Sequence, residues 1–306
     1  MAHRFRRFIP ALFIIGVATT AIGQLGDTPV HAANNQSQAI TLSPASTEVT
    51  VDPGATATKS VDVINSGSDS FNVKVSTSPY YVSGEDYDPR FTQLPGTVDA
   101  SGWVHLSLTS ATIAGLKVLS VPYTVTVPKD TPAGGYYAVV FAETSTDDQK
   151  TGVVSHNRVG DILYITVNGN IKSGGNVIGS PLPSVSFVGS IPISTKVSNS
   201  GGTHFVTKTA YSVTDMTGKL IFTATTERYV LPQTERTITS SWTPQSLFGI
   251  FTVKRSATID GVVKTLPDER IVIINPWVFV AVAFLLGILI GIPFRRARRR
   301  RRSKEK

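Results

Sequence analysis

Three histidines are the first place to look for chemistry, because histidine is the side chain most suited to proton transfer near neutral pH. Beyond the first 32 residues these are His105, His156 and His204. None has a carboxylate or a nucleophile at a recognisable catalytic spacing, and the sequence contains no Gly-x-Ser-x-Gly, His-Glu-x-x-His or phosphate-binding glycine loop. Cysteine is absent, which excludes thiol catalysis, cysteine zinc sites and disulfides. We therefore expect a protein that is not an enzyme and uses no cofactor.

An acidic loop offers the only obvious set of oxygen ligands. Glu85, Asp86 and Asp88 fall within four residues, in the segment SGEDYDPRF. Calcium binds several oxygens from a flexible loop, but this spacing lacks the EF-hand pattern. We favour a solvated turn and predict no metal site.

Four aromatic residues in the same polar, turn-rich segment are the candidate binding residues: Tyr80, Tyr81, Tyr87 and Phe91. Exposed aromatic rings among polar groups suit stacking on a sugar or on a protein partner. The competing interpretation is that a β-sandwich core takes up these rings.

Two strings resemble sortase sorting signals, Leu94-Pro-Gly-Thr97 and Leu231-Pro-Gln-Thr234. Both lie far from the C-terminus, and a working signal would directly precede a terminal apolar segment. Leu-Pro-Gly and Leu-Pro-Gln are ordinary turn sequences, so we expect turns here and no transfer to a cell wall.

The elements that must position these residues are β-strands. Phe71, Val73 and Val75 keep the two-residue period of a half-buried strand, and similar runs recur about every 8–15 residues as far as 270. Asp260-Gly261 predicts a two-residue hairpin turn between two of these strands. No stretch between 34 and 270 has a sustained helical period.

The fold class that follows is all-β: two tandem immunoglobulin-like antiparallel β-sandwiches plus one C-terminal transmembrane helix. The predicted boundaries follow the change to Gly, Ser and Pro near 174 and the charge pattern near the two ends. The predicted segments are a signal peptide at 1–32, a membrane-distal sandwich at 39–173, a linker at 174–183, a membrane-proximal sandwich at 184–274, a transmembrane helix at 276–294 and a basic tail at 295–306.

The two ends carry the positive charge. The formal net charge is +8, and residues 295–306 account for +8 while residues 1–32 add +2, which leaves −2 for residues 33–294. A mildly acidic body argues against nucleic-acid binding. An uncharged run over 277–294 before a basic cluster predicts a single span, with the C-terminus cytoplasmic and the rest outside the cell. The residues predicted to fix this topology are Arg295, Arg296, Arg298, Arg299, Arg300, Arg301 and Arg302.

The arrangement resembles the WxL-interacting cell-surface proteins of Gram-positive bacteria. The strings that carry the resemblance are Pro53-Gly54 before a strand ending at Asn65, Val127-Pro128-Lys129-Asp130 before Gly134-Gly135-Tyr136, and Arg158-Val159-Gly160 before strand 161–169. The resemblance implies a non-enzymatic scaffold that binds peptidoglycan and secreted surface proteins. It assigns no individual contact residue, and the segment PYYVSGEDYDPRF departs from it.

Two functions remain open from the sequence. The leading one is a membrane-anchored adaptor of the cell envelope, which binds peptidoglycan, a secreted surface protein or both through exposed loops and strand edges. The alternative is a chaperone-like assembly factor that transiently holds strands of exported subunits. A receptor or sensor ranks third, because the twelve-residue tail is too short and uniform to fold.

Overall fold

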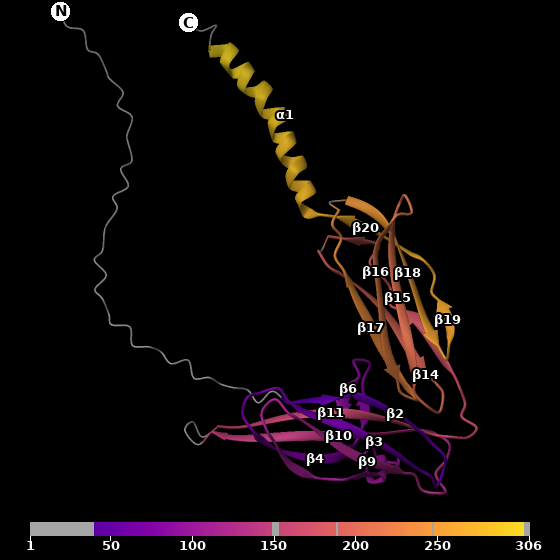
Figure 1. Ribbon diagram of the computed structural model, residues 1–306. Helices are drawn as coiled ribbons and strands as arrows, with labels where there is room; N and C mark the ends of the chain where they lie inside the picture. Colours follow the sequence, from indigo (N-terminus) through magenta and orange to yellow (C-terminus); the bar gives the residue numbers. More distant parts are fainter. Residues whose placement is uncertain (1–39, 149–152, 188, 247, 303–306) are drawn as a thin grey trace, which may run out of the picture. The chain divides into compact units, whose positions relative to one another are not determined.

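The computed structural model describes residues 40–148, 153–187, 189–246 and 248–302. The predicted signal peptide over 1–32 lies outside the described residues, as do the side chains of the seven predicted topology arginines. Within the described part the chain is all-β up to residue 274, and one helix follows (Figure 1).

The first sandwich contains two sheets whose buried faces form one apolar core. The first sheet runs in the order β1 (Ile40–Ser43), β3 (Thr56–Asn65), β9 (Val118–Thr126), β7 (Val104–Leu106). The second runs in the order β2 (Ser46–Val51), β11 (Val153–Val167), β10 (Gly134–Asp148), β4 (Phe71–Pro79), β8 (Ser110–Ile113). A 3-10 helix, η1 (Ala100–Trp103), precedes β7, and the hairpin of β5 (Tyr81–Ser83) and β6 (Asp88–Arg90) stands apart from both sheets. Alternation explains the core, since the inward residues of β9 are Val121, Tyr123 and Val125, all buried.

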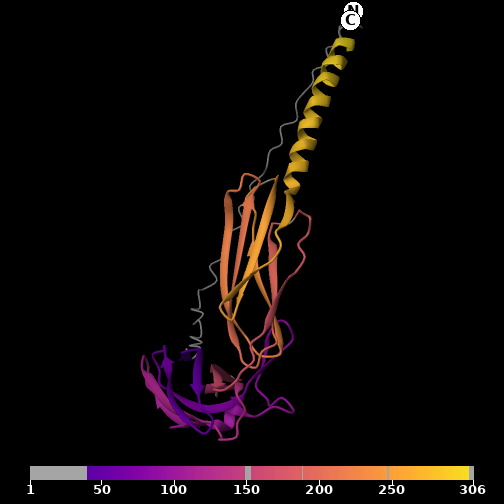
Figure 2. The same cartoon turned by 90° about the vertical axis from the view of Figure 1, so that its right-hand side faces the viewer.

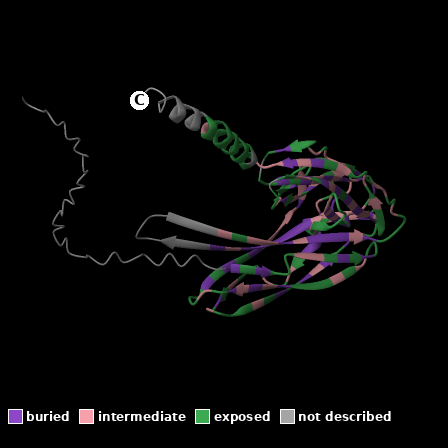
Figure 3. Ribbon diagram, turned by 90° about the horizontal axis from the view of Figure 1, so that it is seen from above, coloured by how far each residue is buried: buried purple, intermediate pink, exposed green. Residues whose placement is uncertain are grey.

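The second sandwich also contains two sheets, whose strands run side by side in Figure 2. One has the order β12 (Gly175–Gly179), β14 (Ile191–Asn199), β17 (Thr234–Trp242). The other has the order β13 (Val185–Ser186), β20 (Glu269–Ile274), β18 (Phe248–Ile259), β15 (Phe205–Asp215), β16 (Leu220–Val230), and β19 (Val262–Thr265) also pairs with β18. Buried and exposed residues alternate along the strands of both sandwiches (Figure 3).

The two sandwiches repeat one topology. The order β2-β11-β10-β4-β8 corresponds strand for strand to β13-β20-β18-β15-β16, and β1-β3-β9 corresponds to β12-β14-β17. Each sandwich has one parallel pair, β2 with β11 and β13 with β20, where the sequence analysis expected only antiparallel pairing. Two-layer sandwiches of this kind are immunoglobulin-like, so the all-β part of the predicted fold class is observed.

A buried asparagine at the same place in each sandwich marks the repeat. The Nδ2 of Asn65 donates to the carbonyl oxygens of residues 69, 113 and 114, and its Oδ1 accepts from Gly67 N. The Nδ2 of Asn199 donates to the carbonyl oxygens of residues 203 and 230, and its Oδ1 accepts from Gly201 N. Both side chains are 2% exposed and begin an Asn-Ser-Gly turn. The repeat is therefore stabilised by the same polar contacts at equivalent positions.

The structure departs from the expected linker over 174–183. Residues 175–179 form β12, which pairs with β14. A Cβ at Gly175 would lie 2.6 Å from the carbonyl oxygen of Ser198, so glycine is required here for close strand pairing. The predicted turn at Asp260-Gly261 is confirmed, since both residues have positive φ between β18 and β19.

The C-terminal helix corrects the predicted membrane span over 276–294. Helix α1 (Pro276–Arg302) follows β20 directly and does not end where the apolar run ends, but continues through the arginines. Within the part of the chain that the structure describes, no helix has the length and apolar character needed to cross a membrane. The transmembrane part of the predicted fold class is therefore wrong, and so is the single-pass location in the cell membrane that depended on it.

Candidate binding site

Residues 80–91, which include the β5–β6 hairpin, contact the second sandwich. Tyr87 lies at the end of the β5–β6 turn with a φ of 63° and is 8% exposed. Its hydroxyl accepts a hydrogen bond from Leu231 N at 2.7 Å and lies 2.5 Å from the hydroxyl of Thr234. The guanidinium of Arg236 lies 4.3 Å from the centre of the Tyr87 ring. This predicted partner-binding residue is thus used inside the chain, as a contact between the two sandwiches.

The acidic residue at the tip of the same hairpin forms a second contact. Glu85 Oε1 accepts a hydrogen bond from Lys196 Nζ at 2.6 Å, and the Glu85 carbonyl oxygen accepts one from Thr237 N at 3.2 Å. The hydrogen bond from Lys196 is the main reason that the pKa of the Glu85 carboxyl lies below its usual value. The Glu85 side chain is 55% exposed and that of Lys196 28%, so solvent screens the ion pair and its contribution is modest. The positive charge beside the Glu85 carboxylate is therefore that of Lys196.

A group of aromatic rings packs beside this hairpin. Tyr164 of β11 stacks on Tyr229 of β16, with ring centres 4.0 Å apart. His204 lies 5.0 Å from Tyr164 and 5.6 Å from Tyr137, and its Nδ1 is 3.3 Å from the Tyr137 hydroxyl. Burial lowers the pKa of His204, which favours a neutral ring at pH 7. This histidine is a packing residue. His105 is exposed, and the side chain of His156 lies outside those described.

The other three predicted binding residues lie near Tyr87 but differ in exposure. Tyr80 is 9% exposed and packs in the cluster that contains Tyr87, whereas Tyr81 is half-buried. Phe91 is 37% exposed and packs edge-on against Phe141, with ring centres 4.9 Å apart. The structure therefore brings these aromatic residues together, and it buries Tyr80 and Tyr87 in a cluster that includes Leu231 of the second sandwich. Their role in ligand binding stays a prediction.

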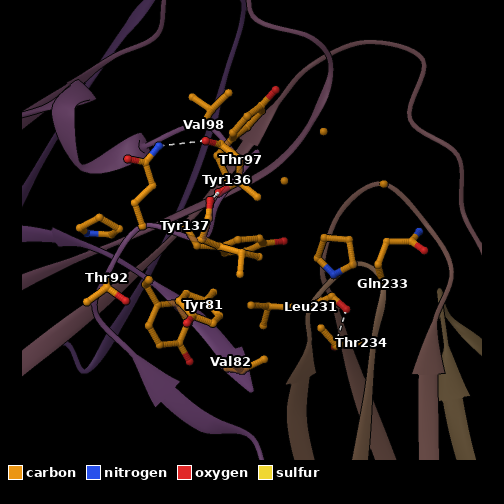
Figure 4. A pocket seen from close by; sticks show the side chains of 18 of the residues that line it. Tyr81, Val82, Thr92, Thr97, Val98, Tyr136, Tyr137, Leu231, Gln233 and Thr234 are labelled. Atoms are coloured by element: carbon orange, nitrogen blue, oxygen red, sulfur yellow. Dashed lines mark hydrogen bonds between the residues drawn. The ribbon is translucent and has the colours of Figure 1, made fainter. Parts of the chain in front are cut away.

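A pocket of about 540 Å³ lies next to this contact (Figure 4). Tyr81, Val82 and Tyr137 face the turn of Leu231, Gln233 and Thr234 across it. Its lining residues share one property, which is that none carries a charged side chain. They are Pro79, Tyr80, Tyr81, Val82, Thr92, Gln93, Leu94, Thr97, Val98, Ala133, Gly134, Gly135, Tyr136, Tyr137, Gly202, Leu231, Pro232, Gln233 and Thr234.

Both sortase-like strings line this pocket and form turns, as expected. The Thr97 hydroxyl donates to the Leu94 carbonyl oxygen at 2.7 Å, and the Thr234 hydroxyl donates to the Leu231 carbonyl oxygen at 2.8 Å. The sequence analysis did not foresee that the two turns, 137 residues apart in the chain, would form walls of one pocket. The lining combines tyrosine rings, threonine hydroxyls and glutamine amides, groups that can form hydrogen bonds and stacking contacts with a ligand.

The metal-ligating side chains show no grouping. Among the described residues, no three His, Asp or Glu side chains lie close enough together to hold an ion.

The other candidate surface is the open edge of β16. This strand has eleven residues and pairs only with β15 among the described strands. Its outer side chains include Leu220, 56% exposed, and Ile221, 39% exposed. The sequence of β16, LIFTATTERYV, contains β-branched and aromatic residues and no proline. A long edge of this kind can accept an added strand.

The repeat shows that an open edge of this length at this position is specific to the second sandwich. The strand equivalent to β16 is β8, which has only four residues. The neighbouring β9, equivalent to β17, is covered by β7, whereas β17 has no covering strand among the described residues. The first sandwich therefore has only a short open edge at β8 and covers β9 with β7, whereas the second leaves both β16 and β17 open among the described strands. The different lengths of the two strands can be predicted from the sequence, but the position of a strand at the edge of its sheet cannot.

Comparisons with known proteins give a similarity of fold only. No family model and no curated protein matches the sequence. The chain is similar to a chaperone and tip-subunit pre-assembly complex of archaic chaperone–usher Csu pili from Acinetobacter baumannii, with 13% identity over 77% of this chain and 98% of that one and a TM-score of 0.39. It is also similar to the E. coli chaperone DraB, with 12% identity over 77% and 97% of the two chains and a TM-score of 0.37. A chaperone–tip adhesin complex of CFA/I fimbriae biogenesis matches at 10% identity, 77% and 99% coverage and a TM-score of 0.39. Similarities this distant carry no argument about function, and none of these structures is described as a WxL-interacting protein, so that resemblance stays a prediction.

Proposed function

We propose that this protein is a non-enzymatic binding protein that holds an extended segment of a partner polypeptide by strand addition to β16. The observation that carries the proposal is the eleven-residue edge, which pairs on one side with β15 and on its other side with no described strand. Strand addition uses backbone hydrogen bonds for affinity and alternate side-chain contacts for selectivity, and it needs no catalytic group.

The N-terminal part of β16 is the most suitable part of the edge. Toward its C-terminal end, the Tyr229 carbonyl oxygen accepts a hydrogen bond from Arg236 Nη1 at 2.7 Å, and the Glu227 carbonyl oxygen accepts one from Arg228. Residues 220–226 have no such side-chain caps on this edge among the described contacts, and the exposed apolar residues Leu220 and Ile221 begin this stretch. An added strand would therefore align with residues 220–226.

The proposed role is that of an assembly factor which holds a strand of an exported subunit and later releases it. The predicted signal peptide over 1–32 supports an exported partner. A stable adaptor for a secreted surface protein would use the same edge but would not release its partner. The lifetime of the complex distinguishes the two roles.

The proposal is tested with peptides of defined length. A display library of random 12-residue peptides is selected against the full chain, and the enriched peptides are then measured against two variants. Ile221→Lys places a charge on the edge, while Val206→Lys places one at a position of similar exposure, 42%, on the adjacent strand β15.

The proposal predicts enriched peptides with alternating apolar residues, whose affinity falls at least about tenfold with Ile221→Lys and is unchanged with Val206→Lys. If no peptide is enriched, or if both variants bind equally well, strand addition to β16 is refuted.

A further inference from the structure

We infer that the pocket between the two sandwiches binds an uncharged saccharide of one or two rings. The pocket is separate from the open edge of β16, so this inference does not depend on strand addition. A volume of about 540 Å³ lies within the usual range for small-ligand sites.

The charge of the lining selects the class of ligand. All nineteen lining residues are uncharged, so no cation is present to neutralise a carboxylate, sulfate or phosphate of a ligand, and no carboxylate is present to neutralise an amine. A charged ligand would lose hydration in this pocket without gaining a partner of opposite charge. The ligand is therefore neutral.

Aromatic rings supply the surface on which a sugar ring can stack. Tyr81 and Tyr136 both contribute to the lining, and both are half-buried (Figure 4). The Tyr81 hydroxyl makes no hydrogen bond to any described residue, so its ring is not held by a polar contact elsewhere in the chain. The apolar face of a saccharide ring packs well on such partly exposed aromatic side chains, while its hydroxyl groups remain available for hydrogen bonds.

The polar groups of the pocket are arranged to accept hydrogen bonds. Gln93 Nε2 donates to the Thr97 carbonyl oxygen at 3.0 Å, and Gln233 Nε2 donates to the carbonyl oxygens of Ser200 and Gly201 at 3.2 and 3.1 Å. These hydrogen bonds from Nε2 fix the orientation of each side-chain amide, and its Oε1 remains available as an acceptor. The hydroxyl groups of a saccharide are matching donors.

The backbone at the pocket argues against a peptide strand as the occupant. The start of β10 lines the pocket, and there Gly135 N already donates to the Gly202 carbonyl oxygen at 2.9 Å. A Cβ at Gly135 would lie 3.1 Å from the Cα of Thr203 in the second sandwich, so the close approach of the two sandwiches here favours glycine. The backbone amide of Gly135 is already used by the second sandwich and cannot pair with an added strand.

The inference is tested with maltose and N,N′-diacetylchitobiose as neutral probes and sialyllactose as the charged probe. Binding to the full chain is measured by saturation-transfer NMR and calorimetry. Tyr81→Ala removes a stacking surface, Tyr81→Phe retains it, and Leu116→Ala is a control at an exposed position outside the pocket lining. Thermal unfolding of each variant confirms that it is folded.

At least one neutral probe should bind, with affinity reduced about tenfold by Tyr81→Ala and changed less than about threefold by Tyr81→Phe and Leu116→Ala. Binding of sialyllactose alone, binding of none of the probes, or equal affinity for the wild type and Tyr81→Ala would each overturn the inference.

Discussion

Removing the Tyr87 hydroxyl tests whether this residue joins the two sandwiches. Tyr87→Phe keeps the ring and its packing against Arg236, but it removes the acceptor for Leu231 N. Leu231 is 3% exposed, so its N–H would be left buried without a partner, at a cost of about 1–3 kcal/mol. Thr234 loses less, because its hydroxyl also donates to the Leu231 carbonyl oxygen. We expect the free energy of unfolding to fall by about 2 kcal/mol.

Urea unfolding of the full chain, followed by circular dichroism and tryptophan fluorescence, measures this loss. Tyr81→Phe is the matched control, since the Tyr81 hydroxyl has no partner among the described residues and its removal should change stability by less than about 0.5 kcal/mol. The reasoning is refuted if the two variants are equally stable, because the hydroxyl of Tyr87 would then contribute nothing to the contact.

Three further predictions concern polar side chains. Burial raises the pKa of Asp161 to about 6, above its value in the unfolded chain, so the stability it provides is complete below about pH 4 and is lost as the pH rises through 6. Asp161→Asn should therefore gain about 3 kcal/mol relative to the wild type between pH 4 and pH 7.5 in urea curves, and a pH-independent difference would contradict this. Glu269→Gln removes the ion-pair partner of Arg255, which is 3% exposed, and should cost about 3 kcal/mol, whereas joint replacement of both by apolar residues should restore part of it in the same assay. Asn65→Ala and Asn199→Ala should each lower the calorimetric unfolding temperature by similar amounts, and a large effect from only one would show that the two turns are not equivalent.

The strands could be predicted because their period is local. Phe71, Val73 and Val75 are buried in β4, and the Asp260-Gly261 turn requires only the positive φ that these residues tolerate. The sequence also contains a sign of the repeat, which is that Asn-Ser-Gly occurs at 65–67 and at 199–201, each time before a strand that begins with phenylalanine. It was missed because three residues of a common turn type are not distinctive until their hydrogen bonds are known.

Glycines misled the prediction of the linker. Gly175 and Gly179 suggested a flexible connection, but they flank a strand in which side chains at these positions would collide with the Ser198 carbonyl oxygen and the Arg255 guanidinium. Glycine is compatible with both a linker and a close backbone contact, and only the neighbouring strand decides between them.

The aromatic residues near the candidate site could be located from the sequence, whereas their part in binding stays a prediction. The sequence analysis selected the aromatic residues of 80–91, and the structure places them beside the pocket and the contact between the sandwiches. It could not foresee that Leu231 and Thr234 would meet Tyr87, because these residues are about 145 positions apart and their contact depends on how two separately folded sandwiches meet. The open edge of β16 was equally hidden, since strand order is a property of the whole sheet.

Hydrogen exchange on the complex with a selected peptide is the most direct test of strand addition. When the peptide is bound, the outward-facing backbone amides of residues 220–226 should become protected in an alternating pattern, because only every second N–H of an edge strand points toward an added strand. Protection should be lost in Ile221→Lys. If residues 220–226 exchange at the same rate with and without the bound peptide, the partner binds elsewhere and the central claim is contradicted.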